Sequence, residues 1–167
     1  MSSVNDDNNV IGAVMVVGGG IAGIQSSMDL ADAGFHVYLV EKSSAIGGVM
    51  AALDKTFPTN DCSIWILAPR LVESARHPNI EIVTNATLKE VSGSAGNFSV
   101  KVRKLPRYVD ETKCTACGVC ASYCPVPTPD PYEEHLNTRK AIHIPYAQAA
   151  PSAFVVDPDY CLFLKKQ

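Results

Sequence analysis

A strand that ends in a glycine-rich turn and continues as a helix constrains the fold more than any other feature of this sequence. Residues 13–17, AVMVV, form the compact apolar run that is typical of a buried parallel strand. The glycines at 18–20 stop this run, residues 24–33 show helical spacing, and Gly34 is placed to end the helix. A second apolar run follows at 36–41. This order of elements predicts a βαβ unit and therefore an α/β fold with a parallel sheet.

The glycine turn also predicts a ligand. Residues 18–23, GGGIAG, fit the pattern G-x-G-x-x-G. Gly18 permits the tight turn, Gly20 lets the backbone approach a pyrophosphate, and Gly23 lets the helix pack closely on the strand. The phosphates would lie at the helix N-terminus, where free N–H groups and the helix dipole favour anions. Glu41, at the end of the second strand, is placed to accept hydrogen bonds from an adenosine ribose. A dinucleotide site is therefore predicted.

A second glycine pair indicates which dinucleotide is bound. Lys42 follows Glu41, and Gly47 and Gly48 come after a short loop, which gives the arrangement E-x5-GG. This arrangement is similar to the FAD-binding units of two-dinucleotide-binding-domain flavoproteins, in which the second pair bends the chain around the cofactor. The pattern favours FAD over NAD. The predicted cofactor-binding residues are Gly18, Gly20, Gly23, Glu41, Lys42, Gly47 and Gly48.

The rest of the chain divides at Pro106, where the composition changes. Before it we expect a helix at 69–76, a strand at 80–83 and the two strands of a hairpin at 87–91 and 98–103. After it the sequence is rich in Cys and Pro, with too few aliphatic residues for a core of its own. The predicted domains are an incomplete FAD-binding Rossmann-like unit at 10–107 and an incomplete ferredoxin-like 4Fe–4S segment at 108–167.

Four cysteines within eleven residues predict an iron–sulfur cluster. The run Cys114-x2-Cys117-x2-Cys120-x3-Cys124-Pro has the spacing of bacterial ferredoxins. Three thiolates at two-residue gaps can wrap one four-iron cubane, while the fourth leaves on a reversed chain to ligate a second cluster. A zinc site would instead need two separated pairs of ligands. The predicted cofactors are therefore FAD and 4Fe–4S cluster(s).

Cys161 leaves two arrangements of the clusters open. A two-cluster ferredoxin needs a second run of cysteines, and Cys161 is the only cysteine after Cys124. In one arrangement Cys124 and Cys161 belong to a second cluster that is short of ligands. In the other, Cys161 closes a single cluster with the first three cysteines of the run. The first arrangement predicts that these 167 residues hold only part of a cluster domain.

Charge and hydropathy exclude several classes of function. The net charge is −3 and the pI is about 5.7, which argue against nucleic acid as a partner. Residues 1–7 are polar and acidic, so they do not form a secretory signal. The longest apolar stretch, 10–24, is interrupted by five glycines, so no membrane span and a cytoplasmic location are expected. With no Ser/His/Asp set and no paired carboxylates, no side chain is assigned a catalytic role.

Several stretches resemble the family of heterodisulfide reductase A-subunits. They lie at 16–23, 53–63, 66–69 and 106–108, and the likeness continues through the cysteine run to 139–142 and 145–149. Members of this family are larger and carry a thioredoxin-reductase-like FAD domain that is interrupted by an inserted ferredoxin domain. The resemblance implies a Rossmann-like FAD-binding unit followed by part of the ferredoxin-like insertion, and hence a fragment or a truncated reading frame.

The resemblance also implies a function. Members of the family receive or split electrons through FAD and pass them to partner subunits B and C. In methanogens these electrons reduce the mixed disulfide of coenzymes M and B, and relatives occur in other anaerobes. The expected activity is that of an electron-transfer oxidoreductase subunit. The alternative is a truncated, non-catalytic module that binds nucleotide or assembles on a partner without turnover.

The sequence departs from the family at one cysteine. Relatives commonly carry a second cysteine three residues after the position of Cys62, and here that position is Trp65. Cys62 therefore has two interpretations, a metal-binding or redox residue and a buried, inert thiol. We favour the buried, inert thiol. The four histidines are scattered without ligand spacing and receive no role.

Overall fold

A three-stranded parallel sheet forms the centre of the fold in the computed structural model, which describes residues 12–166. The strands are β1 (Ala13–Val17), β2 (His36–Val40) and β5 (Ile80–Val83), in the order β1-β2-β5. β1 and β2 run parallel in register, with Val17 opposite Val40. The predicted strands are confirmed, except that the second ends at Val40 and does not include Glu41. The predicted polar start at 1–7, and residues 10, 11 and 167 of the predicted domains, lie outside the described residues.

Helix α1 (Ile21–Asp32) begins directly after the glycine turn, three residues earlier than predicted. As predicted, Gly34 ends this helix. Its φ is +92°, which residues with a Cβ rarely adopt. The N–H of Gly34 donates to the carbonyl of Ala31 at 3.0 Å, and the N–H of Phe35 donates to that of Leu30 at 3.1 Å. These two bonds form a Schellman motif, which terminates the helix and returns the chain to β2.

Helix α2 (Ser63–Arg76) starts six residues before the predicted start at 69, so that prediction was wrong. Pro69 lies inside the helix, although a proline there removes one backbone hydrogen bond. Leu67 and Leu71 flank it, with exposed fractions of 0% and 1%. Burying two leucines contributes about 3–6 kcal/mol, which offsets the cost of the proline, about 3 kcal/mol.

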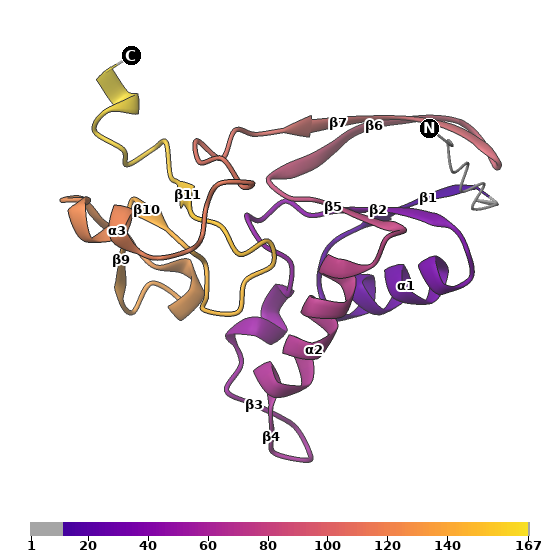
Figure 1. The fold of residues 1–167 in the computed structure, drawn as a ribbon, viewed down its shortest axis with the longest axis horizontal. Coiled ribbons are helices and arrows are strands. Elements are labelled where there is room, and N and C mark those ends of the chain that lie inside the picture. The colour runs from indigo at the N-terminus through magenta and orange to yellow at the C-terminus, as the bar shows by residue number, and fades with distance from the viewer. Residues whose placement is uncertain (1–11, 167) are drawn as a thin grey trace, which may run out of the picture.

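The main core lies between the sheet and the two long helices, which cover the same face of the sheet (Figure 1). Its buried members are Ile24, Met28, Leu39, Ile46, Ala51, Leu67, Leu71 and Ala150. Ala150 belongs to the predicted cysteine segment, as does Tyr146, which packs against the same core. The two predicted domains therefore share this core. No helix within residues 12–166 is long and apolar enough to cross a membrane.

A long hairpin lies on the opposite face of the sheet (Figure 1). Its strands, β6 (Ala86–Ser94) and β7 (Asn97–Lys104), confirm the predicted hairpin and extend it at both ends. Ser94 pairs with Asn97, so a two-residue loop joins the strands. Between hairpin and sheet lies an apolar hollow of about 850 Å³. Its lining includes Met15, Tyr38 and Val40 from the sheet, and Val91 and Phe98 from the hairpin.

Two short segments after β2 were not predicted. The 3-10 helix η1 (Gly48–Ala52) follows the second glycine pair. It leads into a small hairpin of β3 (Lys55–Thr56) and β4 (Asp61–Cys62), which projects from the body below α2 (Figure 1).

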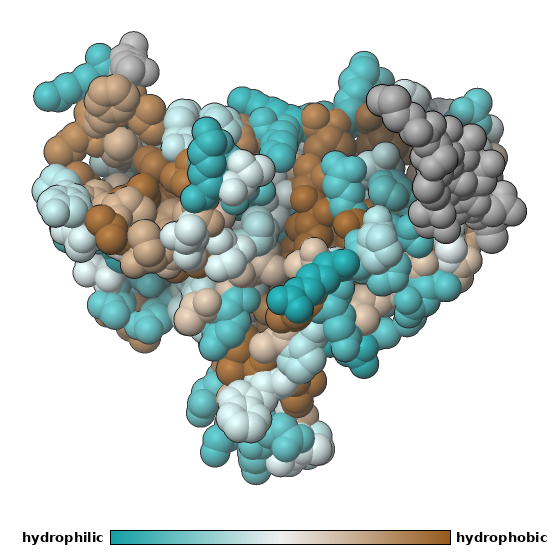
Figure 2. All heavy atoms as spheres, viewed as in Figure 1, coloured by the Kyte–Doolittle hydropathy of each residue, from teal (hydrophilic) through white to brown (hydrophobic). Residues whose placement is uncertain are grey.

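The cysteine segment has little regular structure, in agreement with its composition. Its elements are short: α3 (Val119–Tyr123), β8 (Pro127–Pro129), η2 (Pro131–Glu133), β9 (Thr138–Lys140), β10 (Ile142–His143), β11 (Val155–Val156) and η3 (Leu164–Lys166). Large apolar side chains stay at its surface, on the left in Figure 2, and Tyr123, Leu136 and Phe163 are 83%, 90% and 70% exposed. The segment therefore buries few large side chains of its own.

Candidate functional site

The glycine turn leaves open space where a cofactor is expected. Gly18 has a φ of +105°, so the tight turn requires glycine. A Cβ on Gly23 would lie 1.9 Å from the carbonyl oxygen of Gly18, which explains why helix and turn can pack only with glycine there. Gly20 differs, because a Cβ on it would meet nothing within 4 Å. The packing of the protein therefore does not demand glycine at position 20, whereas a pyrophosphate approaching the backbone would.

The N-terminus of α1 is free to bind an anion. Its N-cap is Gly20, no side chain caps it, and its first turn contains no acidic residue. The first N–H groups of a helix have no partner within the helix, and the dipole gives this end a partial positive charge. This end of α1 therefore has the chemistry that phosphate groups need.

Glu41 is buried directly beside the turn, with 7% of its surface exposed. One carboxylate oxygen accepts from the N–H of Gly19 at 2.6 Å, and the other accepts from the N–H of Ser43 at 2.7 Å. Since each carboxylate oxygen has two lone pairs, both can still accept a ribose hydroxyl. Glu41 thus connects the glycine turn with the loop after β2. The neighbouring Lys42 is exposed.

The second glycine pair packs on the first. The N–H of Gly47 donates to the carbonyl of Gly19 at 2.6 Å, and Gly47 forms a parallel bridge with Gly20. Gly48 has a φ of +58°, and a Cβ on it would lie 2.9 Å from the Cα of Gly20. The structure therefore brings the two predicted glycine groups and Glu41 together in one cradle, which we call the nucleotide cradle (residues 18–23, 41–43 and 47–48).

The cysteine segment supports the back of this cradle. The Tyr146 hydroxyl donates to the carbonyl of Ile46, and the N–H of Ile46 donates to the carbonyl of Ala150 at 2.9 Å. Burial raises the pKa of Tyr146 to about 12, so the hydroxyl keeps its proton as a donor. Tyr132 stacks on Tyr146, with 6.0 Å between the ring centroids. No local sequence pattern marks these tyrosines, because their contacts join segments about a hundred residues apart.

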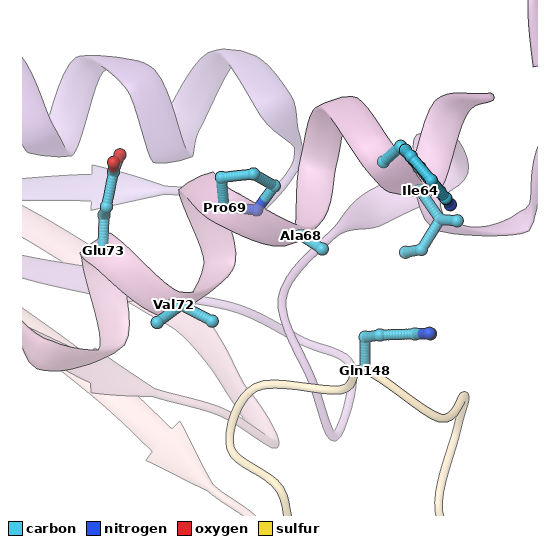
Figure 3. A pocket seen from close by; sticks show the side chains of 7 residues that line it. Ile64, Ala68, Pro69, Val72, Glu73 and Gln148 are labelled. Carbon is cyan, nitrogen blue, oxygen red and sulfur yellow. The ribbon is translucent and has the colours of Figure 1, made fainter. Parts of the chain in front are cut away.

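An apolar groove of about 580 Å³ separates α2 from the loop at 145–150 (Figure 3). Its lining residues are Ile64, Trp65, Ala68, Pro69, Val72, Glu73 and Gln148. In Figure 3, Gln148 extends from the loop and the others lie on the helix. This lining contains no predicted cofactor-binding residue and no predicted cysteine ligand, so the groove is separate from the nucleotide cradle.

Three of the predicted cluster ligands lie close enough together to influence one another. Burial raises the pKa of the Cys120 thiol, and the thiols of Cys114 and Cys117 raise it further. A hydrogen bond from the Val119 amide lowers the pKa of Cys117. The Sγ of Cys114 accepts from the N–H of Phe154 at 3.4 Å. Amides that donate to sulfur favour the thiolate, which is the form that binds metal.

The other two predicted ligands lie in different surroundings. Burial of Cys124 raises the pKa of its thiol, but the backbone amides of Ile142, Val126 and Ala141 outweigh this effect and lower it. Cys161 lies in a turn, where its N–H donates to the carbonyl of Asp157 at 3.0 Å.

The cysteine thiols have the donor chemistry of an iron–sulfur cluster. Between residues 12 and 166, no three His, Cys, Asp or Glu side chains are arranged to hold one ion. The thiolates of a cubane bind four different irons, so they lie farther apart than the ligands of one ion. The donor set consists of thiols, and each cysteine of the run has at least one backbone amide as a hydrogen-bond donor, which is the chemistry that a 4Fe–4S cluster requires.

Cys62 is exposed, so the interpretation as a buried thiol was wrong. It ends β4 and forms the N-cap of α2 on the projecting hairpin, where few other elements can cover it. Phe57 and Trp65 in the same region are 96% and 81% exposed. Residues 53–62 of the family-like motif therefore lie at or near the surface, and only its last residue, Ser63, is buried.

Because His143 is buried, we expect the folded protein to lose stability in acid. His143 is 8% exposed, and burial followed by the charge of Arg139 lowers its pKa to about 4. Since the unfolded chain takes up this proton near pH 6.5, the stabilisation is complete above pH 6.5 and is lost as the pH falls to about 4. The loss is at most about 3 kcal/mol. Urea unfolding at a series of pH values should show a smaller acid loss in His143→Gln, and no change in the exposed control His135→Gln. An equal slope in His143→Gln and wild type would contradict the assignment.

Two protein families match the sequence. The FAD dependent oxidoreductase family matches residues 13–112, and the 4Fe-4S binding domain family matches residues 107–128. The first match includes every residue of the nucleotide cradle, and the second includes the run from Cys114 to Cys124. Both predicted cofactors, FAD and 4Fe–4S, are thereby confirmed, and so is the predicted fold class.

Curated relatives cover nearly the whole chain. The iron-sulfur A-subunit of the CoB–CoM heterodisulfide reductase of Methanocaldococcus jannaschii is 54% identical over 148 residues, which are 89% of this chain and 22% of that protein. The second such A-subunit of Methanopyrus kandleri is 56% identical over 89% of this chain and 23% of that protein. The solved L-proline dehydrogenase from P. horikoshii is 25% identical with a TM-score of 0.47, over 55% of this chain and 19% of that chain. This chain thus spans about a fifth of the length of its curated relatives.

One assignment follows from the nucleotide cradle, the cysteine run, the two family matches and the curated relatives. The chain belongs to the FAD-dependent oxidoreductase family, and its resemblance to the heterodisulfide reductase A-subunits is confirmed over 89% of its length.

Proposed function

We propose that this chain is the part of a heterodisulfide-reductase-like protein in which FAD and 4Fe–4S clusters exchange electrons. The observation that carries the proposal is the shared core: Ala150 and Tyr146 of the cysteine segment pack against the same core as Ile46, next to the nucleotide cradle. This packing supports a fixed relation between the two cofactor sites. We retain 10–107 and 108–167 as the proposed extents of the two units.

In this proposal the cradle holds the ADP half of FAD. The backbone at Gly18, Gly20 and Gly23 and the N-terminus of α1 bind the pyrophosphate, and Glu41 binds the ribose. Lys42 lies at the rim beside the ribose and supplies a positive charge there. Gly47 and Gly48 bring the loop after β2 close to Gly20, as their contacts with Gly19 and Gly20 suggest.

The cysteines bind the clusters in this proposal. Cys114, Cys117 and Cys120 supply three thiolates to one cubane. Cys124 belongs to a second cluster together with Cys161. In the other arrangement Cys161 closes the first cluster, and serine variants of Cys161 and Cys124 distinguish the two.

The chemistry is the transfer of electrons without a catalytic side chain. FAD exchanges electrons in pairs or singly and a cluster exchanges them singly, so the two together convert two-electron into one-electron transfer. The protein's residues bind these groups and hold them in place. We propose a cytoplasmic complex of anaerobic metabolism in which the electrons pass to subunits similar to B and C of heterodisulfide reductase.

The proposal is tested on the complete protein, purified without oxygen. We expect one FAD per chain, together with iron and sulfide, and reduced-cluster EPR signals that appear when the flavin is reduced. A protein that binds NAD in place of FAD, or contains no iron, would overturn the proposal. A cofactor-free protein that still binds its partner subunits would support the non-catalytic alternative.

Replacement of Glu41 should weaken the binding of FAD. In Glu41→Ala the ribose loses a charge-assisted acceptor, and the N–H groups of Gly19 and Ser43 lose theirs, so binding should weaken by about 1–3 kcal/mol. Titration of the flavin-free protein with FAD measures this change. The control is Glu90→Ala, which removes an exposed carboxylate paired with Lys101. If Glu41→Ala binds FAD as tightly as this control, the ribose is held elsewhere.

A further inference from the structure

Arg107 connects the nucleotide cradle with the cysteine segment, and its exposed fraction is 6%. On the cradle side, Nη2 donates to the carbonyl of Ser44 and, at 2.9 Å, to the hydroxyl of Thr84. On the cysteine side, Nη1 donates to the carbonyl of Ala153 at 3.1 Å, and Nε donates to the carboxylate of Glu111 at 2.6 Å. One buried guanidinium thus has acceptors in four separate segments.

These four segments adjoin the predicted cofactor sites. Ser44 lies three residues after Glu41, and Thr84 directly follows β5. Glu111 lies three residues before Cys114. A guanidinium is planar and rigid, so acceptors on its different edges are held in a fixed arrangement. A flexible lysine could not satisfy all of them.

The contact with Ala153 reaches a cluster ligand through one peptide group. The carbonyl of Ala153 and the N–H of Phe154 belong to the same planar peptide unit. Arg107 binds the oxygen of this unit, and its N–H donates to the Sγ of Cys114 at 3.4 Å. Because the unit is planar, fixing the oxygen also fixes the direction of the N–H.

We propose that Arg107 is a positioning residue that aims the N–H of Phe154 at the sulfur of Cys114 and thereby raises the reduction potential of the cluster. Hydrogen bonds to cluster sulfurs stabilise the more negative, reduced state. The inference rests on the proposed function in one respect, the assignment of Cys114 as a ligand. Through Arg107, contacts on the cradle side of the protein then influence the reduction potential of the cluster.

The test compares Arg107→Met with Arg70→Met in the complete protein, purified without oxygen. Arg70 is a matched control, because it is a surface arginine paired with Glu73 at 3.2 Å. Potentiometric titration followed by EPR should show a more negative midpoint potential for one cluster in Arg107→Met, and the wild-type potential in Arg70→Met. Hydrogen exchange of the Phe154 amide should be accelerated about tenfold or more in Arg107→Met, the effect of losing a hydrogen bond of about 1.4 kcal/mol. Wild-type potential and wild-type exchange together would overturn the proposal.

A second variant keeps the test decisive if Arg107→Met does not fold. Thr84→Val removes one acceptor on the cradle side, with little change in the shape of a residue that is 2% exposed. A smaller shift of the potential in the same direction supports the proposal, and an unchanged potential overturns it. Failure of the proposed function is seen separately, as wild-type protein without a cluster signal. In that case amide exchange at Phe154 in Thr84→Val decides the positioning role alone.

Discussion

Replacing Gly20 with valine should strip the protein of flavin while leaving its fold intact. A Cβ on Gly20 meets no protein atom within 4 Å, and it lies at the uncapped N-terminus of α1, where the pyrophosphate is expected. A pyrophosphate displaced from there would lose at least two charge-assisted hydrogen bonds, or about 3 kcal/mol and about 100-fold in Kd. The flavin absorbance of the purified protein measures the loss.

The matched control for this variant is Gly12→Val. Gly12 also has room for a side chain, with its nearest neighbour, a ring carbon of Phe35, at 4.0 Å. It lies outside the glycine turn, so the flavin content should stay at the wild-type level. In the flavin-free form, where no bound cofactor adds stability, thermal unfolding of both variants should resemble that of the wild type. Flavin at full occupancy in Gly20→Val would mean that the turn has only a structural purpose.

Replacing Cys117 with serine should abolish the stable four-iron cluster. Removal of one of three thiolates around a cubane exposes one more iron, which is then lost readily. The matched control is Cys62→Ser, since both cysteines are exposed but only Cys117 lies in the run. Iron and sulfide analysis after anaerobic purification, with EPR of the reduced protein, measures the difference. Equal iron content in the two variants would remove Cys117 from the ligand set.

Two further serine variants separate the arrangements of the clusters. If Cys161 closes the first cluster, Cys161→Ser should lose the cubane signal, and Cys124→Ser should keep it. If Cys124 and Cys161 serve a second cluster, reconstituted residues 1–167 should contain fewer than four irons per chain, as three-iron species or as none. About four irons per chain, with a stable reduced cubane signal, would contradict this second arrangement.

The sequence was sufficient for the parts of the fold whose signals are local. β1, β2 and β5 are the parallel strands of one sheet, and each appears in the sequence as a short apolar run. The end of α1 was predictable because only glycine adopts the φ of Gly34 without strain. The hairpin of β6 and β7 showed alternation around a glycine-containing turn.

The parts that the sequence missed depend on distant contacts. The proline at 69 suggested a helix start, whereas the burial of Leu67 and Leu71 against the core keeps the earlier turns helical. Cys62 was expected to be a buried, inert thiol because Trp65 replaces the second cysteine of the relatives, but its hairpin projects away from the body and leaves it exposed. The same is true of the site. The cradle could be predicted from the spacing of its residues in the sequence, while the contacts of Arg107 and Tyr146 with distant segments could not.

The bridge between Ile46 and Ala150 also orders the events of biosynthesis. A ribosome makes residue 46 long before residue 150, so the loop that carries Gly47 and Gly48 emerges without its backbone partner. The acceptor for the Ile46 N–H and the Tyr146 donor to the Ile46 carbonyl arrive only after all four cysteines of the run have been translated. The nucleotide cradle therefore gains this support only after the four cysteines of the run have left the ribosome, and before Cys161 does. A nascent chain that stops at the Pro106 boundary still lacks the support for its own cradle.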